Sequence, residues 1–87
     1  MKLMIVIVHD TDNDAVLQAL LSQGFRVTRV ASTGGFLRRG NVTLLIGVEA
    51  EKVENVFDIL KQTTRPVEQE QHRATVFVVD MPYFEQI

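Results

Sequence analysis

The sequence predicts a single α+β domain over residues 1–87, with a ferredoxin-like βαββαβ order. Two observations on these 87 residues carry the prediction. Four segments have the apolar or alternating pattern of strands, and two have the helical spacing of apolar residues. They follow one another as strand, helix, strand, and then strand, helix, strand. Right-handed crossovers fold this order into a four-stranded antiparallel sheet with both helices on one face.

The first half of the chain contains a strand, a helix and a second strand. Residues 3–8 are apolar and mostly β-branched, as in a strand that is buried on both faces. Residues 10–12 break this run and offer side-chain caps to a helix over 13–23, which Gly24 ends. Residues 25–31 alternate between apolar and polar side chains, as in a second strand. The apolar stripe of the helix comprises Val16, Leu17, Ala19, Leu20 and Leu21.

The second half begins with two turns, at residues 32–35 and 38–41. A third strand follows at 42–48, and a second helix is predicted over 51–63 because its apolar residues recur at helical spacing. Arg65 precedes a proline, which ends the helix. The apolar face of this helix comprises Val53, Val56, Phe57 and Leu60.

The chain closes with a polar loop over residues 67–73, a fourth strand at 74–79 and a tail at 81–87. The helices cover only one face of the sheet, yet several strands are apolar on both faces. Soluble monomers rarely expose such a patch, so we expect other copies of the chain to bury it. The alternative is that the tail and the polar loop fold over it. The segments that are apolar on both faces are Met4–Val8, Leu44–Ile46 and Val76–Val79.

Composition excludes several classes of function. The chain has no cysteine, which excludes disulfides, zinc-thiolate sites and thiol catalysis. A formal net charge of −2 argues against general nucleic-acid binding. The first apolar run is too short for a membrane span and is followed by His9 and Asp10 with no cleavage site. We therefore expect a cytoplasmic protein that binds neither membrane nor nucleic acid.

The segment from Ser32 to Gly35 carries the strongest signal for a ligand. Gly34 and Gly35 permit backbone conformations in which successive N–H groups converge on an anion such as phosphate. Phe36 offers a face for stacking on a base. The alternative is a plain loop between two strands, since short glycine motifs have many false positives. Side chains that supply counter-charge or polar edges are Arg26, Thr28, Arg38, Arg39 and Asn41.

No catalytic or metal site is predicted. The hydroxyl residues have no base nearby in sequence, so the chain is not expected to be an enzyme. His9 lies near Asp10 and Asp12, but their spacing suits the start of a helix better than a metal site. RNA-recognition modules share this strand and helix order, but they stack bases on aromatic residues that the strands at 4–8 and 42–46 lack.

The chain resembles the PII-like cyclic di-AMP receptor family over most of its length. The block from Ala31 to Asn41 is the most specific part of this resemblance. The matching segments are Met1–Leu3, Arg26–Thr28, Ala31–Leu37, Gly40–Thr43, Ile46–Val48, Ala74–Val78 and Phe84–Ile87.

The resemblance implies a PII-like homotrimer that binds a bacterial cyclic dinucleotide at the clefts between its subunits. It also implies that a loop rearrangement passes the signal to a protein partner whose identity the sequence leaves open. No other cofactor is implied. Gly47 would leave room for the base. The residues expected to contact the ligand are Arg26, Thr28, Thr33, Gly34, Gly35, Phe36, Leu37, Arg38, Asn41 and Gly47.

The chain also departs from the family pattern. Its connection between the second helix and the last strand, residues 64–73, is shorter than the family's long loop. His72 and Arg73 stand where a glycine pair is usual, and Gly24 replaces a residue that is typically asparagine. An alternative function follows, in which the chain is a trimeric scaffold that has lost cyclic di-AMP binding or binds another adenine nucleotide.

Overall fold

The computed structural model describes residues 1–30, 40–65 and 72–87, and the structural statements below concern these residues. Two single-turn 3-10 helices, η1 (Asp10–Asp12) and η2 (Ala50–Lys52), each lead into an α-helix. The other elements are β1 (Lys2–His9), α1 (Asn13–Ser22), β2 (Arg26–Val30), β3 (Asn41–Val48), α2 (Val53–Thr63) and β4 (Ala74–Asp80).

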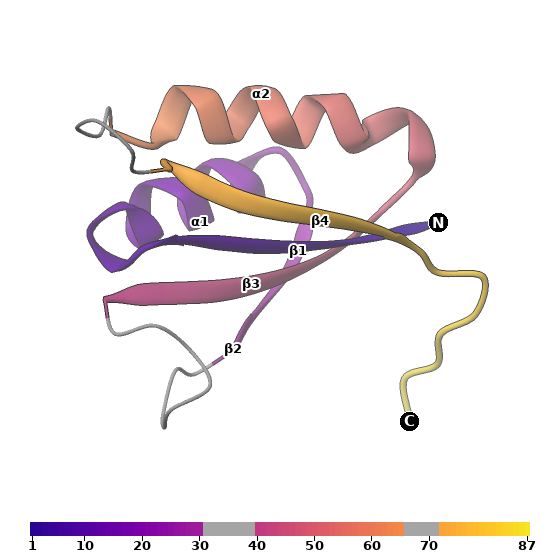
Figure 1. Cartoon of the computed structure of the whole chain (residues 1–87). Coiled ribbons are helices and arrows are strands. Elements are labelled where there is room, and N and C mark those ends of the chain that lie inside the picture. The colour runs from indigo at the N-terminus through magenta and orange to yellow at the C-terminus, as the bar shows by residue number, and fades with distance from the viewer. Residues whose placement is uncertain (31–39, 66–71) are drawn as a thin grey trace.

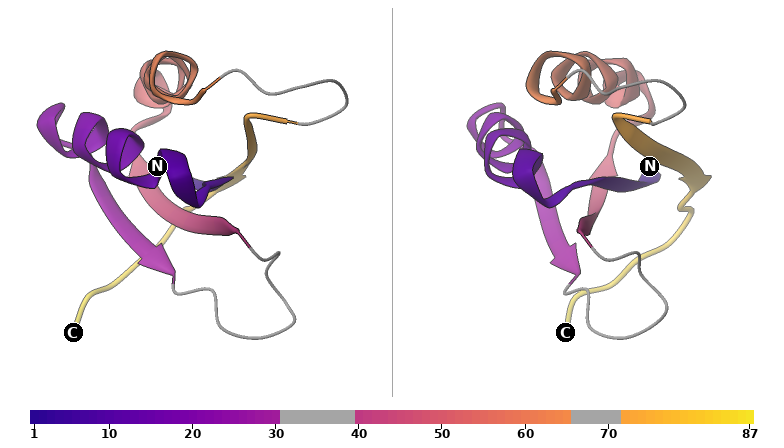
Figure 2. Two further views of the ribbon diagram at one scale, coloured as in Figure 1. Left: turned by 90° about the vertical axis from the view of Figure 1, so that its left-hand side faces the viewer. Right: turned by 60° about the vertical axis from the view of Figure 1, so that its left-hand side comes forward.

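The four strands form one antiparallel sheet in the order β2-β3-β1-β4. Both helices lie on the same side of this sheet (Figures 1 and 2). Ile5 at the centre of β1 pairs with Leu45 of β3 on one side and with Phe77 of β4 on the other. The predicted ferredoxin-like α+β fold is therefore confirmed.

The core lies between the sheet and the helices, because alternate residues of the strands point toward them. On β1, Met4, Val6 and Val8 are buried, whereas the residues between them are only half-buried. The expectation that this strand is covered on both faces thus holds for one face of the single chain. The helices contribute Val16, Leu20, Val56 and Leu60 to the core.

Helix α1 ends as predicted at Gly24, in a Schellman motif. Gly24 has a φ of +86°, a left-handed conformation that glycine adopts without strain. Its N–H donates to the carbonyl of Leu21 (3.0 Å), and the N–H of Phe25 donates to the carbonyl of Leu20 (3.1 Å). One expectation was wrong. Leu21 is 53% exposed, because the face that meets the core is set by Val16 and Leu20.

The start of α1 also differs from expectation. The residues expected to cap it, 10–12, form the η1 turn, and Asp12 makes no side-chain capping hydrogen bond. The Asp12 carboxylate is only 3% exposed and instead accepts from the backbone N–H of Arg65 (3.4 Å). It also pairs with Arg65 Nε at 3.5 Å. A long-range contact to the end of α2 therefore replaces the local cap.

An exposed ion pair links the edge strand β4 to β1. Lys2 and Asp80 are register partners at one end of the two strands, and Lys2 Nζ donates to Asp80 Oδ1. This hydrogen bond, together with the positive charge of Lys2, lowers the pKa of the Asp80 carboxyl.

The helices α1 and α2 are short, and no helix in the described parts of the chain is long and apolar enough to cross a membrane.

Two neighbouring leucines of α1 test this assignment of the core. Leu20→Ala removes a fully buried side chain and should lower the free energy of unfolding by about 2–5 kcal/mol. Leu21→Ala is the matched control and should change it by about 0.5 kcal/mol or less. Urea unfolding at a fixed protein concentration measures both. Equal losses for the two variants would contradict the described orientation of α1.

A cationic hollow at one edge of the sheet

A hollow of about 240 Å³ lies where β2 begins and β3 ends. The end of α1 and the η2 turn complete its walls. Arg26 and Gly47, two residues predicted to bind the ligand, are register partners across β2 and β3 and both line the hollow. The lining residues are Gln23, Gly24, Phe25, Arg26, Gly47, Val48, Glu49 and Lys52.

The strand register determines which predicted residues share a face. Val27 pairs with Ile46, which is buried in the core, so the neighbouring Arg26 and Thr28 lie on the face away from the helices. Asn41 and Gly47 lie on that face as well, at opposite ends of β3. Six residue-to-residue steps along the strand separate them by roughly 20 Å. The single chain thus brings Arg26 and Gly47 together and leaves Asn41 at the far end of the sheet.

The space beside Gly47 is bounded by two methionines. A Cβ atom at Gly47 would lie 3.4 Å from Met81 Cε and 3.8 Å from Met1 Cε, which is ordinary van der Waals contact. The N–H of Met81 donates to the carbonyl of Met1 (3.1 Å) and holds the two residues together. Alanine would therefore fit at position 47. A flat ligand group beside Gly47 would have to displace the Met81 side chain.

At Gly24, by contrast, the hollow is open. No atom lies within 4 Å of the position that a Cβ would occupy there. The positive φ of Gly24 is one that asparagine tolerates better than most other residues do. The absence of a side chain at this position therefore enlarges the hollow without altering the turn that forms it.

The hollow contains two cationic side chains. Arg26 and Lys52 both line it, with Glu49 as the acidic lining residue. Two ion pairs are present among the described residues, and neither includes Arg26 or Lys52. Their positive charges therefore remain available to an anionic group in the part of the chain that the structure describes.

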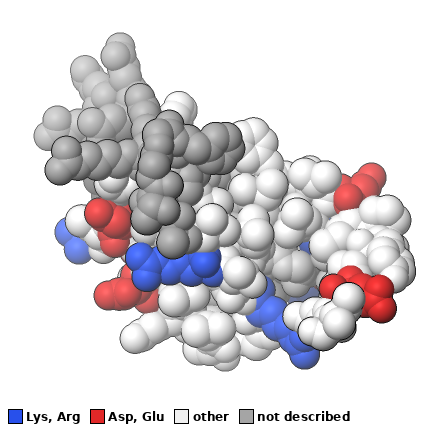
Figure 3. Space-filling model, turned by 90° about the horizontal axis from the view of Figure 1, so that it is seen from below, with Lys and Arg blue, Asp and Glu red and all other residues white. Residues whose placement is uncertain are grey.

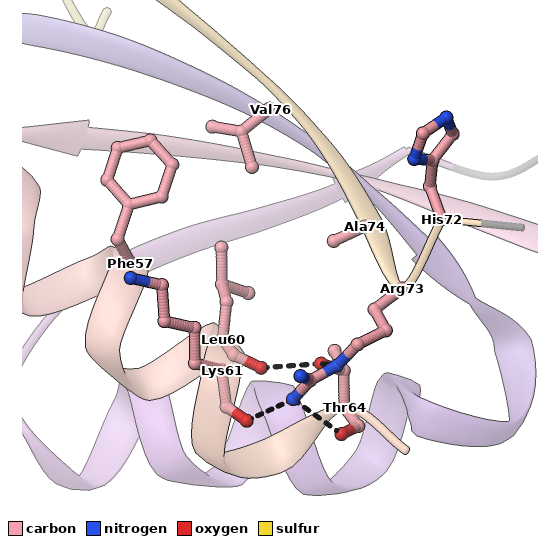
Figure 4. Close-up of a pocket in the computed structure, with 8 residues that line it drawn as sticks. All are labelled: Phe57, Leu60, Lys61, Thr64, His72, Arg73, Ala74 and Val76. Atoms are coloured by element: carbon pink, nitrogen blue, oxygen red, sulfur yellow. Dashed lines mark hydrogen bonds between the residues drawn. The ribbon is translucent and has the colours of Figure 1, made fainter. Parts of the chain in front are cut away.

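A second hollow, of about 210 Å³, lies between the end of α2 and the start of β4 (Figure 4). The arginine that lines this hollow, Arg73, already makes hydrogen bonds within the chain. Arg73 Nε donates to Thr64 Oγ1 (3.1 Å), and Nη2 donates to the carbonyls of Thr64 (3.1 Å) and Lys61. The guanidinium thus satisfies carbonyls that the end of a helix leaves without partners. We interpret this arginine as structural.

Six predicted ligand residues, 33–38, lie outside the described residues, as does Arg39. The group of His9, Asp10 and Asp12 is not brought together as a metal site. His9 Nε2 donates to the carbonyl of His72 (3.1 Å), and Asp12 pairs with Arg65. No cluster of three potential metal ligands occurs in residues 1–30, 40–65 and 72–87.

Two lining residues of the hollow with Arg26, Gln23 and Lys52, were not predicted from the sequence to belong to the site. Both lie in polar stretches at the end of a helix or just before one, where solvated side chains are common. A signal for Lys52 was present but weak, since it is a basic residue in the acidic stretch at the start of the second helix.

The fold places the chain among ferredoxin-like α+β domains, with a cationic hollow at the edge of the sheet. Its family is shown by a model of cyclic-di-AMP receptors that matches residues 1–72. The chain therefore belongs to the cyclic-di-AMP receptor family. It is also similar to a protein of unknown function from Pediococcus pentosaceus ATCC 25745, for which a crystal structure exists. The two chains are 35% identical, with 99% of this chain and 96% of that one covered and a TM-score of 0.79.

The structural role of Arg73 can be tested by mutation. Arg73→Ala leaves the carbonyls at the end of α2 without a partner and should lower the free energy of unfolding by about 1–3 kcal/mol. Arg73→Lys should recover part of the loss, because a lysine lacks the planar fork of donors. Arg29→Ala, at an exposed arginine of β2, is the control. Urea unfolding in which Arg73→Ala matches the wild type would contradict the assignment.

Proposed function

We propose that the protein is a signal-transduction sensor that binds cyclic di-AMP in the clefts between the subunits of a homotrimer. Binding involves no turnover, and a loop rearrangement passes the signal to a partner protein. Membership of the cyclic-di-AMP receptor family supports the ligand. The observation that carries the proposal is the pairing of Arg26 with Gly47 in a hollow suited to an anion.

The chemistry of the hollow fits a cyclic dinucleotide. Each such ligand has two phosphodiester groups, and a guanidinium binds a phosphate through two parallel hydrogen bonds. Arg26 supplies this group, and the Thr28 hydroxyl lies on the same face to donate or accept a further bond. Gly47 has no side chain, so the base can approach the strand closely once the Met81 side chain moves aside. The other proposed contacts are Asn41 and residues 33–38.

The size of the hollow supports a site shared between subunits. Its volume of about 240 Å³ is below the roughly 300–1,000 Å³ of pockets that enclose a small ligand. The hollow of one chain is thus too small to enclose such a ligand by itself, which supports a site that two subunits share. A neighbouring subunit that covers the exposed face of the sheet would also close the hollow at its edge.

The exposed face of the sheet is the surface proposed for this contact. Figure 3 looks onto it and shows a broad uncharged area between charged groups. Phe77 of β4 is 53% exposed and Val79 is 46% exposed, although both are apolar. Soluble monomers rarely leave such a patch uncovered. The apolar residues of this face on the two central strands are Leu3, Ile5, Ile7 and Leu45.

A second function rests on a different observation. The Met81 methyl group lies in contact with the position that a Cβ at residue 47 would occupy, and Gly24 contributes no polar group to the hollow. Both features favour a trimeric scaffold that does not bind cyclic di-AMP, or one that binds another adenine nucleotide. The two functions differ in whether the purified protein binds cyclic di-AMP.

Isothermal titration distinguishes them. The wild-type protein should bind cyclic di-AMP in preference to ATP and cyclic di-GMP. Arg26→Ala should weaken binding by about tenfold or more, the loss expected for a charge-assisted hydrogen bond. Arg29→Ala is the matched control, because Arg29 lies on the same strand but pairs with the core residue Leu44 and so faces the other side. A wild type that gives no heat with cyclic di-AMP would favour the scaffold.

Light scattering coupled to size exclusion tests the assembly. The wild type should have three times the mass of one chain. Phe77→Glu places a charge on the apolar face and should shift the mass toward that of the monomer. Leu21→Glu is the control, since Leu21 is equally exposed, at 53%, but lies on a helix. A monomeric wild type, or an unchanged mass for Phe77→Glu, would contradict the proposed assembly.

A further inference from the structure

The hollow with Arg26 continues into a neighbouring one. This neighbouring hollow has a volume of about 230 Å³ and shares Gln23, Phe25 and Lys52 with the hollow that contains Arg26. Its other lining residues are Asn55, Asp58 and Ile59. Lys52 therefore lines both hollows, one of which includes Gly47 and the other residues of α2.

The backbone of Lys52 is fixed although its side chain is exposed. The residue ends the η2 turn, and its N–H donates to the carbonyl of Glu49 (2.9 Å). Glu49 lines the same hollow, yet no ion pair joins the two side chains. A lysine that is anchored by its backbone and keeps its ammonium group unpaired among the described residues is suited to meet an anion.

We infer that Lys52 is a second phosphate-binding residue of the site. This inference rests on the proposed function and extends it, because the ligand carries two phosphates and the described hollow holds two cations. Arg26 binds one phosphate through its planar fork, and the ammonium of Lys52 binds the other as a compact charge with three donors. Without Lys52, Arg26 would be the one cation among the described residues that line the hollow, with the acidic Glu49 in the same lining.

The alternative is that Lys52 is a solvated lysine that offsets the acidic residues around the start of α2. Surface charges of this kind contribute little to stability and do not touch a ligand. The two roles predict different results for ligand binding. Removal of the Lys52 side chain lowers the affinity for cyclic di-AMP only if that side chain contacts the ligand.

Titration with cyclic di-AMP separates these roles in the full chain. Lys52→Ala should weaken binding by about tenfold, as expected for the loss of one charge-assisted hydrogen bond. Lys52→Arg should retain most of the affinity, since it keeps the charge. Lys61→Ala is the matched control, because Lys61 lies on α2 but lines the separate hollow between the end of α2 and the start of β4. The affinity of Lys52→Ala should also fall less steeply with added salt than that of the wild type, because one charge contact is gone.

Each outcome decides between these possibilities. Equal affinities of Lys52→Ala and the wild type, with a clear loss in Arg26→Ala, would overturn the inference and leave the proposed function intact. A wild type that does not bind cyclic di-AMP would overturn both. Thermal unfolding of each variant confirms that it is folded, and Lys52→Gln replaces the alanine variant if that one is not.

Discussion

The register between β2 and β3 is the constraint on which the rest of the site depends. It pairs Arg26 with Gly47 and directs Arg26 away from the core, while Val27 faces the helices. A slip of one residue would exchange the two faces of β2 and turn Val27 from the core toward the open face of the sheet. The slip would therefore cost the apolar contact that Val27 makes with the core. The packing of the core thus also fixes the position of Arg26, the arginine that we propose to bind the ligand.

Most of the fold could be predicted from the sequence, because strands and helices have different hydrophobic periods. The errors arose where a distant contact outweighed a local preference. Asp12 is an ordinary helix-capping residue by type, but its carboxylate binds Arg65, which is remote in sequence. Leu21 fits the helical stripe, yet α1 turns the face with Val16 and Leu20 toward the core and leaves Leu21 exposed. No local pattern contains this information.

The site was predictable to a smaller extent. The resemblance to a known family indicated Arg26 and Gly47, and the register brings them together. Lys52 could not be identified in that way. Its place in the hollow depends on how the start of α2 lies against the start of β2, and these two segments are far apart along the chain. Spacing within a segment describes one element, whereas a binding site is formed where several elements meet.

The two faces of the sheet contribute differently to stability and function. The face toward the helices is closed by side chains of the same chain and forms an ordinary core. The opposite face is apolar but half-open, and the hollow lies at its margin. If a ligand occupies a cleft that two subunits share, its binding free energy also stabilises their association. Ligand concentration and assembly would then be thermodynamically linked.

The contacts at the end of α2 have a consequence for how the chain tolerates changes in length. Arg65 is held by Asp12, the carbonyl of His72 accepts from His9, and Arg73 is bound to the last turn of the helix. Both ends of the connection between α2 and β4 are therefore attached to the body of the domain. Each doubling of a connection anchored in this way costs only about 0.6 kcal/mol of loop-closure entropy. Insertions and deletions between these anchors can thus accumulate with little effect on folding, and related chains can carry connections of very different length on the same domain.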